Sequence, residues 1–266
     1  MTKELMFESQ PDGKKGFVWL VGAGPGAADL ITVRGLKILQ GAEAVVYDEL
    51  ANRDLLQNCP PACAFHSVGK RAGKHSATQD EINRLLVGLA NEGRNTVRLK
   101  GGDPLVFGRA GEEIEALREA GIAFEIVPGV TAATASAASL GLPLTHRDCS
   151  SAVVFVTGHQ CAANTDALDW GALARLRATL CFYMGVRRLP EIARNLRQHG
   201  MAAEMPLALI SEATRPTQKI TITTLGAAEN IPPEEIVQPA LVVIGEVVRL
   251  SDFAVRVPEL AGRAAP

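Results

Sequence analysis

The sequence predicts an α/β protein with two consecutive α/β domains, and three observations lead to this prediction. Strand-like apolar segments alternate with segments of helical periodicity, a pattern typical of largely parallel sheets covered by helices. The chain has 266 residues, which is enough for two domains. Pro128-Gly129 then interrupts the alternation near the middle of the chain. We therefore expect a mobile tail at 1–15, domains at 16–128 and 129–252, and a second tail at 253–266.

The first half contains five expected strands, with helices between them. A helix over 78–91 opens with the capping box Thr78-Gln79-Asp80-Glu81, which satisfies amide donors at a helix start. Another helix is expected over 109–120, because Gly121 is placed to end it. Earlier helices are expected over 29–40 and 53–57. The expected strands are 17–21, 44–47, 64–67, 95–99 and 123–127.

The second half has its own strands and helices. A helix over 190–198 has Pro190 in its first turn and Gly200 just beyond its end, which is the usual asymmetry of these residues. Residues 215–223 alternate apolar and polar side chains, which favours a half-exposed antiparallel strand. The expected strands are 152–157, 179–183, 207–210, 219–223 and 240–245.

Composition excludes several classes of function. With 47% hydrophobic and 21% charged residues the chain is typical of globular proteins, and a net charge of −2 argues against nucleic acid as a partner. Five cysteines without a repeated spacing indicate free thiols in a reducing compartment and no metal site. The first sixteen residues lack a signal-peptide core, and no apolar run approaches the roughly 20 residues of a membrane span. We therefore expect a cytoplasmic protein without a membrane partner.

A first glycine loop, Gly22-Ala23-Gly24-Pro25-Gly26-Ala27, follows the first strand, and Asp48 closes the second. This arrangement fits the dinucleotide fingerprint, which needs an acid for the ribose, so an NAD-dependent dehydrogenase is one candidate. Pro25, however, removes a backbone donor where a pyrophosphate would bind. A dinucleotide, a ligand without phosphates and a purely structural turn all remain open for this loop.

A second glycine loop lies within 99–113, where four glycines and a proline stand among charged residues between a strand and a helix. Open α/β sheets bind ligands at this position. A dinucleotide does not require a Gly-Gly-Asp-Pro turn at another strand end, so two such loops favour a different ligand in a cleft.

Eight motifs, in order, resemble those of the tetrapyrrole methylases. Together they extend from about Gly16 to Leu250 and are far more specific than either glycine loop alone. The chain is most similar to the members that convert uroporphyrinogen III to precorrin-2. The motifs are 21–26, 46–48, 68–73, 98–108, 127–132, 143–147, 156–159 and 182–185.

The resemblance implies a tetrapyrrole methylase fold, with two α/β domains and S-adenosylmethionine in a cleft between them, and a homodimer without a metal. It implies methylation of uroporphyrinogen III at carbon, twice, through precorrin-1 to precorrin-2. Another tetrapyrrole (precorrin) methylase, a relative acting on protein or RNA, and a non-catalytic ligand sensor remain alternatives. The implied cofactor contacts are Pro25, Gly101, Gly102, Asp103, Val106, Thr131, Ala132, Met184, Ala213 and Ala240. The chain departs from the family pattern at Ala27, where an acid is common, and at Ala213, where glycine is common.

Methyl transfer from a sulfonium requires orientation more than a nucleophilic side chain, because the substrate carbon is the nucleophile. Uroporphyrinogen III is a polycarboxylic acid, so its implied contacts are the cations Arg109, Arg147, Lys70 and Arg71. Each of the two arginines could instead have an ordinary role, Arg109 in opening a helix and Arg147 on a solvated loop.

Each methylation also releases a proton, and Asp48 and Glu112 are the available acids. Glu112 lies three residues after Arg109 on one helix face, so we expect these two to pair, which favours Asp48 as the base. Lys70 would hold the substrate or return a proton. Asp48 could equally cap a strand end, and Met184 could equally be a core residue.

Overall fold

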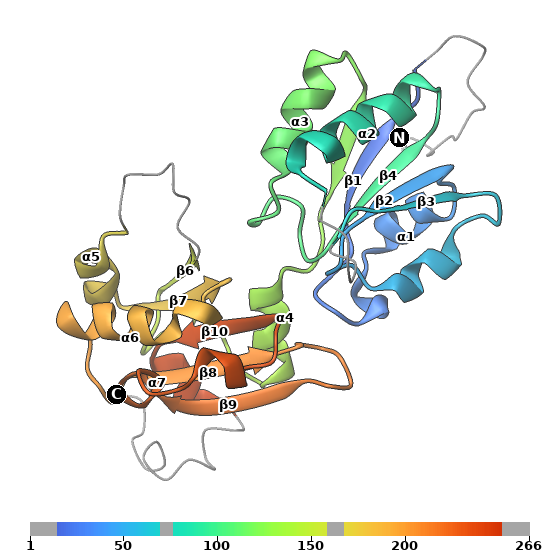
Figure 1. Ribbon diagram of the computed structural model, residues 1–266. Helices are drawn as coiled ribbons and strands as arrows, with labels where there is room; N and C mark the ends of the chain where they lie inside the picture. Colours follow the sequence, from blue (N-terminus) through green and yellow to red (C-terminus); the bar gives the residue numbers. More distant parts are fainter. Residues whose placement is uncertain (1–14, 70–76, 159–167, 252–266) are drawn as a thin grey trace. The chain divides into compact units, whose positions relative to one another are not determined.

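The structure is a computed structural model that describes residues 15–69, 77–158 and 168–251. The chain divides into two compact units, Met1–Thr131 and Ala132–Pro266. Each unit contains a five-stranded sheet with helices packed on it, so the predicted α/β class is confirmed (Figure 1). The tails expected at 1–15 and 253–266 lie outside the described residues, except for Lys15.

The first sheet is parallel throughout, with strand order β3-β2-β4-β1-β5. Because the strands are parallel, their carboxyl ends meet at one edge of the sheet, and the loops that follow them gather there. We call this the carboxyl edge of the first sheet. Its strands are β1 (Val18–Gly22), β2 (Ala44–Tyr47), β3 (Ala64–Ser67), β4 (Thr96–Lys100) and β5 (Phe124–Val127).

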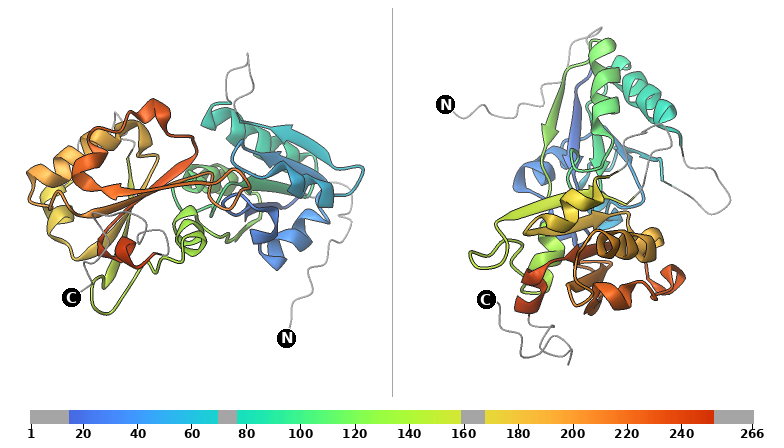
Figure 2. Two further views of the ribbon diagram at one scale, coloured as in Figure 1. Left: turned by 90° about the horizontal axis from the view of Figure 1, so that it is seen from below. Right: turned by 90° about the vertical axis from the view of Figure 1, so that its left-hand side faces the viewer.

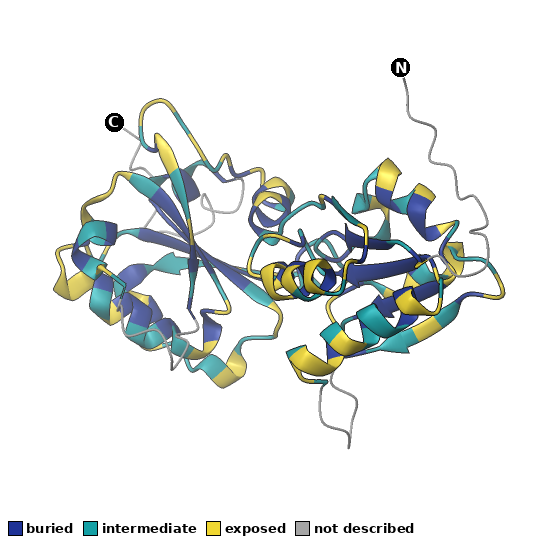
Figure 3. Ribbon diagram, turned by 90° about the horizontal axis from the view of Figure 1, so that it is seen from above, coloured by how far each residue is buried: buried dark blue, intermediate teal, exposed yellow. Residues whose placement is uncertain are grey.

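Helices cover both faces of this sheet (Figure 2). On one face α1 (Val33–Leu39) packs against Val45, Val97 and Leu99. On the other face α2 (Gln79–Asn91) and α3 (Ala110–Glu119) pack against Leu20 and Val46. Figure 3 shows the result, with buried strands and helices whose outer residues are exposed. The capping box predicted at Thr78 is present at the start of α2.

The predicted start of the helix over 29–40 is wrong. Ala28–Leu30 forms a short 3-10 helix, and α1 begins only at Val33, after Thr32. The Thr32 backbone is extended, and its hydroxyl accepts a hydrogen bond from the Gly35 amide at 3.1 Å, which makes it the helix cap. The segment expected as a short helix near 53 is also a 3-10 helix, Arg53–Asn58. The first glycine loop therefore does not lead directly into an α-helix.

The second sheet is mixed, with strand order β6-β7-β10-β8-β9. β6 and β7 are parallel, and the other neighbouring pairs are antiparallel. The antiparallel strand predicted within 215–223 is confirmed as β9, at the end of the order. The strands are β6 (Ala152–Thr157), β7 (Ala178–Tyr183), β8 (Pro206–Ser211), β9 (Lys219–Thr224) and β10 (Ala240–Ile244).

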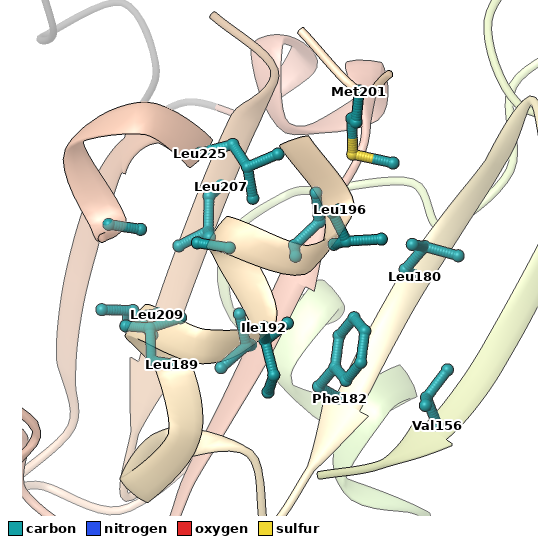
Figure 4. Close-up of a cluster of buried hydrophobic side chains, with 14 of the residues drawn as sticks. Val156, Leu180, Phe182, Leu189, Ile192, Leu196, Met201, Leu207, Leu209 and Leu225 are labelled. Atoms are coloured by element: carbon teal, nitrogen blue, oxygen red, sulfur yellow. The ribbon is translucent and has the colours of Figure 1, made fainter. Parts of the chain in front are cut away.

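The helices of the second unit pack on both faces of its sheet. On one face Leu189, Ile192 and Leu196 of α6 (Leu189–Gln198) contact a core that includes Phe182 (Figure 4). On the other face α4 (Ala132–Ser139) contributes small side chains. The remaining elements are α5 (Trp170–Arg175), α7 (Leu225–Ala228) and the 3-10 helices Val186–Arg188, Pro233–Glu235 and Glu246–Leu250.

Candidate functional site

The glycine loops of the first unit pack backbone against backbone at the carboxyl edge. The Gly24 amide donates to the Gly102 carbonyl at 3.3 Å, and the Gly102 amide donates to the Gly24 carbonyl at 2.7 Å. A Cβ on Gly129 would lie 2.3 Å from the Gly102 carbonyl oxygen, and one on Gly22 would lie 2.6 Å from the Gly129 Cα. Only glycine permits such close contact, so these residues join the loops after β1, β4 and β5.

The two adjacent glycines of the second loop have different roles. A Cβ on Gly101 would lie 2.5 Å from the Leu50 Cβ, so Gly101 gives room to the loop after β2. Gly102 has a φ of +68°, and apart from its own chain neighbours no atom of the described residues lies within 4 Å of its Cβ position. Gly102 is therefore the glycine of this pair at which a ligand can approach the backbone.

Asp103 ties the second loop to the turn after β5. Its Oδ1 accepts a hydrogen bond from the Leu105 amide at 2.9 Å, and its Oδ2 accepts one from the Gly129 amide at 3.0 Å. Both carboxylate oxygens thus hold protein backbone. Pro25 and Val106, the other expected contacts of these loops, are half-buried.

Asp48 stands directly after β2, at the same carboxyl edge. Its Oδ1 accepts hydrogen bonds from the amides of Leu50 and Ala51, each at 3.1 Å. Its Oδ2 lies 3.5 Å from Nη2 of Arg98, and the side chain is 28% exposed. The strand-end cap considered for Asp48 is therefore present through Oδ1, while Oδ2 accepts only the long contact from Arg98. Its role as a base remains a prediction.

The expected pair between Arg109 and Glu112 is confirmed. Nε and Nη2 of Arg109 each donate to one Glu112 oxygen at 2.7 Å, and both side chains are exposed. The hydrogen bond from Arg109 is the main reason that the pKa of Glu112 lies below its usual value. Arg109 itself has a φ of +56° at the start of α3. Both acids therefore face an arginine, but the 3.5 Å contact between Arg98 and Asp48 is longer than the 2.7 Å contacts between Arg109 and Glu112.

Sequence reasoning missed a cluster of buried charges below the second glycine loop. Arg98 and Lys100 of β4 and Glu113 of α3 are each no more than 3% exposed. Nε of Arg98 and Nζ of Lys100 each lie 2.9 Å from Glu113 carboxylate oxygens. The sequence held a partial signal, because Arg98 lies in the strand expected over 95–99 and Lys100 directly follows it, and charges in a buried strand need partners.

In the second unit, one sheet edge gathers another part of the predicted site. Met184 directly follows β7, Ala213 follows β8 closely, and Ala240 begins β10. The antiparallel register that pairs Val242 with Phe182 brings Ala240 to the level of Met184. Because β8 ends beside the start of β10, Ala213 reaches the same edge. We call this the Met184 edge.

The start of α4 also lies at the Met184 edge. The Ala133 amide donates a hydrogen bond to the Tyr183 hydroxyl at 3.0 Å, which places Ala132 beside the end of β7. Thr131, the expected contact just before it, is the last residue of the first unit and is half-buried. Met184 is 55% exposed, so its alternative interpretation as a core residue is wrong.

Left-handed backbone marks both edges. Among the described residues, positive φ angles outside glycine occur after β4, after β7 and after β8. Such conformations cost of order 1–3 kcal/mol each and cluster at functional sites. The residues are Phe107, Arg109, Met184, Glu212 and Thr214.

The structure does not bring Arg147 to the Met184 edge. Arg147 is exposed on a turn that the His146–Ser150 bridge closes. The Ser150 hydroxyl lies 2.9 Å from the Thr179 hydroxyl, near the start of β7. The turn is therefore at the opposite edge of the second sheet. Lys70 and Arg71, the other expected cations, lie outside the described residues.

Within residues 15–69, 77–158 and 168–251, no three His, Cys, Asp or Glu side chains are grouped as a metal site would require. No helix within them combines the length and the apolar character needed to cross a membrane.

The chain belongs to the tetrapyrrole methylases, because the model of the Tetrapyrrole (Corrin/Porphyrin) Methylases matches residues 18–229. The resemblance found in the sequence is thereby confirmed. Siroheme synthase 1 of Pectobacterium atrosepticum is 51% identical over 240 residues, which cover 90% of this chain and 50% of that protein. The chain thus spans about half the length of the curated relatives it matches.

Solved structures agree with the family. Uroporphyrin-III C-methyl transferase from Thermus thermophilus, complexed with S-adenyl homocysteine, has a TM-score of 0.76 and 37% identity, covering 88% of this chain and 94% of its own. A cobalt precorrin-4 methyltransferase has a TM-score of 0.77 and 28% identity, covering 87% of this chain and 95% of its own. The fold is therefore that of a tetrapyrrole methylase.

Proposed function

We propose that this protein transfers methyl groups from S-adenosylmethionine to carbon atoms of uroporphyrinogen III, twice, through precorrin-1 to precorrin-2. The observation that carries this proposal is the similarity, over 88% of the chain, to a uroporphyrin-III C-methyl transferase structure that holds S-adenyl homocysteine. The identity of 51% to a siroheme synthase supports the same substrate, because sirohaem is made from precorrin-2.

The residues at the two sheet edges fit S-adenosylmethionine, which supplies an electrophilic methyl group when bound. Gly102 offers open space on the Cβ side of its backbone, and Met184 offers an exposed, uncharged side chain. A sulfonium and its methyl group need close, weakly polar contacts of this kind rather than phosphate-binding lysines. The proposed cofactor contacts are Pro25, Gly101, Gly102, Asp103, Val106, Thr131, Ala132, Met184, Ala213 and Ala240.

Within that set we distinguish proposed direct contacts from supporting residues. Gly101 faces Leu50, and the Asp103 carboxylate holds the backbone of Leu105 and Gly129. These two residues therefore shape the loop and offer a ligand only their backbone. The space at the Cβ position of Gly102 is open, which supports Gly102 as the proposed direct contact of the second loop.

Arg109 is the proposed carboxylate contact of the first unit. It is exposed on the loop that leads from β4 to α3, the same sheet edge that carries Asp48. Its bidentate pair with Glu112 uses Nε and Nη2 and fixes the guanidinium at this edge, where a planar, permanently charged group can bind a substrate carboxylate. Arg147 and Lys70 are further proposed contacts on the sequence resemblance alone.

Asp48 is the proposed base for the proton that each methylation releases. Two backbone amides fix its Oδ1, so Oδ2, which has only a long 3.5 Å contact with Arg98, would accept the proton. Glu112 is the second candidate, but it would first have to release Arg109.

The family resemblance also leads us to propose a homodimer, which sedimentation of the purified protein tests directly.

The decisive experiment incubates the purified protein with uroporphyrinogen III and methyl-labelled S-adenosylmethionine. We expect two labelled methyl groups per product molecule. We also expect the absorption spectrum of oxidised precorrin-2 after the product has been oxidised. Transfer only to a later precorrin would favour a methylase like the cobalt precorrin-4 enzyme. Binding of S-adenosylmethionine without methyl transfer would indicate a ligand sensor. Reduction of NAD with oxidation of a substrate would indicate a dehydrogenase. Any of these three results would refute the proposal.

A further inference from the structure

β4 carries three polar residues on the face that α2 and α3 cover. Thr96, Arg98 and Lys100 alternate along this face, and all five residues of the strand are buried. The residues that flank Arg98 on the neighbouring strands are Leu20 and Val46, both apolar and fully buried. The central strand therefore places two positive charges in an otherwise apolar layer.

Glu113, from α3, pairs with both of these charges. Its carboxylate accepts two hydrogen bonds from Nζ of Lys100 and one from Nε of Arg98, each at 2.9 Å. Gln79, at the start of α2, donates to the same carboxylate at 3.5 Å. Burial, and then repulsion from Arg98, lower the pKa of Lys100, while Glu113 opposes both effects.

Stability alone does not explain this arrangement. Removing charges from water costs several kcal/mol per ion, and apolar residues of similar volume often replace a buried ion pair without loss of stability. The layer around the cluster is already built from Leu, Ile and Val side chains that pack without such a cost. The charges therefore call for another role.

Each end of the cluster touches a part of the proposed site. At one end the Arg98 guanidinium lies 3.5 Å from Oδ2 of Asp48 and also donates to the Val46 carbonyl at 3.3 Å. At the other end Cε of Lys100 lies 3.2 Å from the position of a Cβ on Gly108. Gly108 directly precedes Arg109. The cluster thus connects the proposed base to the loop that carries Gly102 and Arg109.

We propose that Arg98, Lys100 and Glu113 form a positioning unit that holds Asp48 and the 101–109 loop in one fixed geometry for methyl transfer. The proposal rests on the function proposed above. None of the three residues needs to touch the substrate. Arg98 orients the Asp48 carboxylate, Lys100 supports the loop from below, and Glu113 joins the two.

The test uses a double variant that keeps the cluster neutral. Lys100→Met with Glu113→Gln removes one positive and one negative charge, so Arg98 and Asp48 still balance each other. The matched control, Arg197→Met with Glu229→Gln, removes a more exposed ion pair in the second unit. Both proteins are compared by circular dichroism, hydrogen exchange, S-adenosylhomocysteine calorimetry and methyl transfer.

We expect the double variant to fold, while amide exchange in 101–109 rises and α2 stays protected. Its kcat should fall about a hundredfold, the loss that a small misplacement of reacting groups can produce, and its affinity for S-adenosylhomocysteine should fall about tenfold. The control should match the wild type. A second variant, Arg98→Lys, keeps the charge but loses the planar fork. It should lower kcat with little change in S-adenosylhomocysteine affinity.

The outcomes separate this proposal from the proposed function. A folded double variant with wild-type loop exchange, affinity and kcat would overturn the positioning unit. If the double variant does not fold, a wild-type kcat in Arg98→Lys would overturn it equally. If the wild type neither binds S-adenosylhomocysteine nor methylates uroporphyrinogen III, the proposed function fails. Amide exchange of residues 101–109 in the double variant then tests the structural claim by itself. Exchange equal to that of the wild type would show that the cluster does not support the loop.

Discussion

The carboxyl edge of the first sheet and the Met184 edge of the second are built from different residues. At the first, Gly22, Gly102 and Gly129 let three loops touch, and buried charges lie below. At the second, the chain turns through left-handed Met184 and Glu212, and Tyr183 fixes the start of α4. The first edge holds the proposed base Asp48 and the exposed cation Arg109, while at the second edge Met184 is uncharged and Glu212 is paired with Arg215. Proton chemistry should therefore depend on the first edge.

The largest expected effect follows from Asp48. Asp48→Asn keeps the size of the side chain and an oxygen for the Leu50 and Ala51 amides, but it cannot accept a proton. We expect turnover to fall by roughly a hundred- to ten-thousand-fold, the usual contribution of a general base, while both ligands still bind. Rapid-quench methyl transfer and calorimetry measure the two quantities. A fully active Asp48→Asn enzyme beside an inactive Glu112→Gln enzyme would move the role to Glu112.

Substrate binding gives the next largest contrast. Arg109→Ala removes an exposed cation at the first edge, and we expect uroporphyrinogen III to bind less tightly by about 2 kcal/mol, with S-adenosylhomocysteine unaffected. Arg147→Ala removes an exposed cation near the start of β7, at the edge opposite Met184. Substrate calorimetry on both variants shows whether Arg147 contributes as the sequence resemblance implies. Normal substrate binding with loss of cofactor binding in both variants would reverse the assignment of the two ligands.

Much of this fold could be predicted because its signals are local. The bounds of β3 and the capping box at Thr78 agree with the sequence prediction. α4 was missed because 132–139 consists of Ala, Ser and Thr, which give no contrast between a buried and an exposed face. The start of α1 was misplaced because Thr32 could be interior or cap, and its extended backbone decides this.

The candidate site, like the fold, could be predicted from the sequence only in part. Glycine loops and the spacing of Arg109 and Glu112 are visible in the sequence, and the structure contains the pair. The buried charges were missed because charged residues usually indicate exposed surface, and only the strand order places β4 in the middle of the sheet. The left-handed conformation of Met184 has no sequence signal, because methionine rarely adopts it.

Stability measurements can test the difference between the two edges directly. Gly102→Ala adds a Cβ to a residue with a φ of +68°, which should cost about 1–2 kcal/mol although the space is open. Met184→Gly removes the Cβ from a left-handed residue whose side chain is largely exposed, so the relief of strain should offset the flexibility of glycine. Urea unfolding should therefore show a clear loss for the first variant and a change near zero for the second. Equal losses in the free energy of unfolding for the two variants would show that contacts of the Met184 side chain stabilise its conformation, rather than that the residue is strained.

The smallest expected effect concerns pH and the Arg109–Glu112 pair. The pKa of Glu112 is lowered, first by its hydrogen bond with Arg109, so the folded protein binds this proton less readily than the unfolded chain. The contribution of the pair is therefore complete above the unfolded pKa of about 4.3 and disappears as the pH falls through the lower, folded value. Both side chains are exposed, so solvent screening keeps the stability effect small. An NMR titration of the Glu112 carboxyl carbon should show a midpoint below that of an ordinary glutamate, and Arg109→Ala should restore the ordinary midpoint. If the Glu112 midpoint in Arg109→Ala equals that in the wild type, the pair does not persist in solution. Glu112 would then be as available for proton transfer as Asp48.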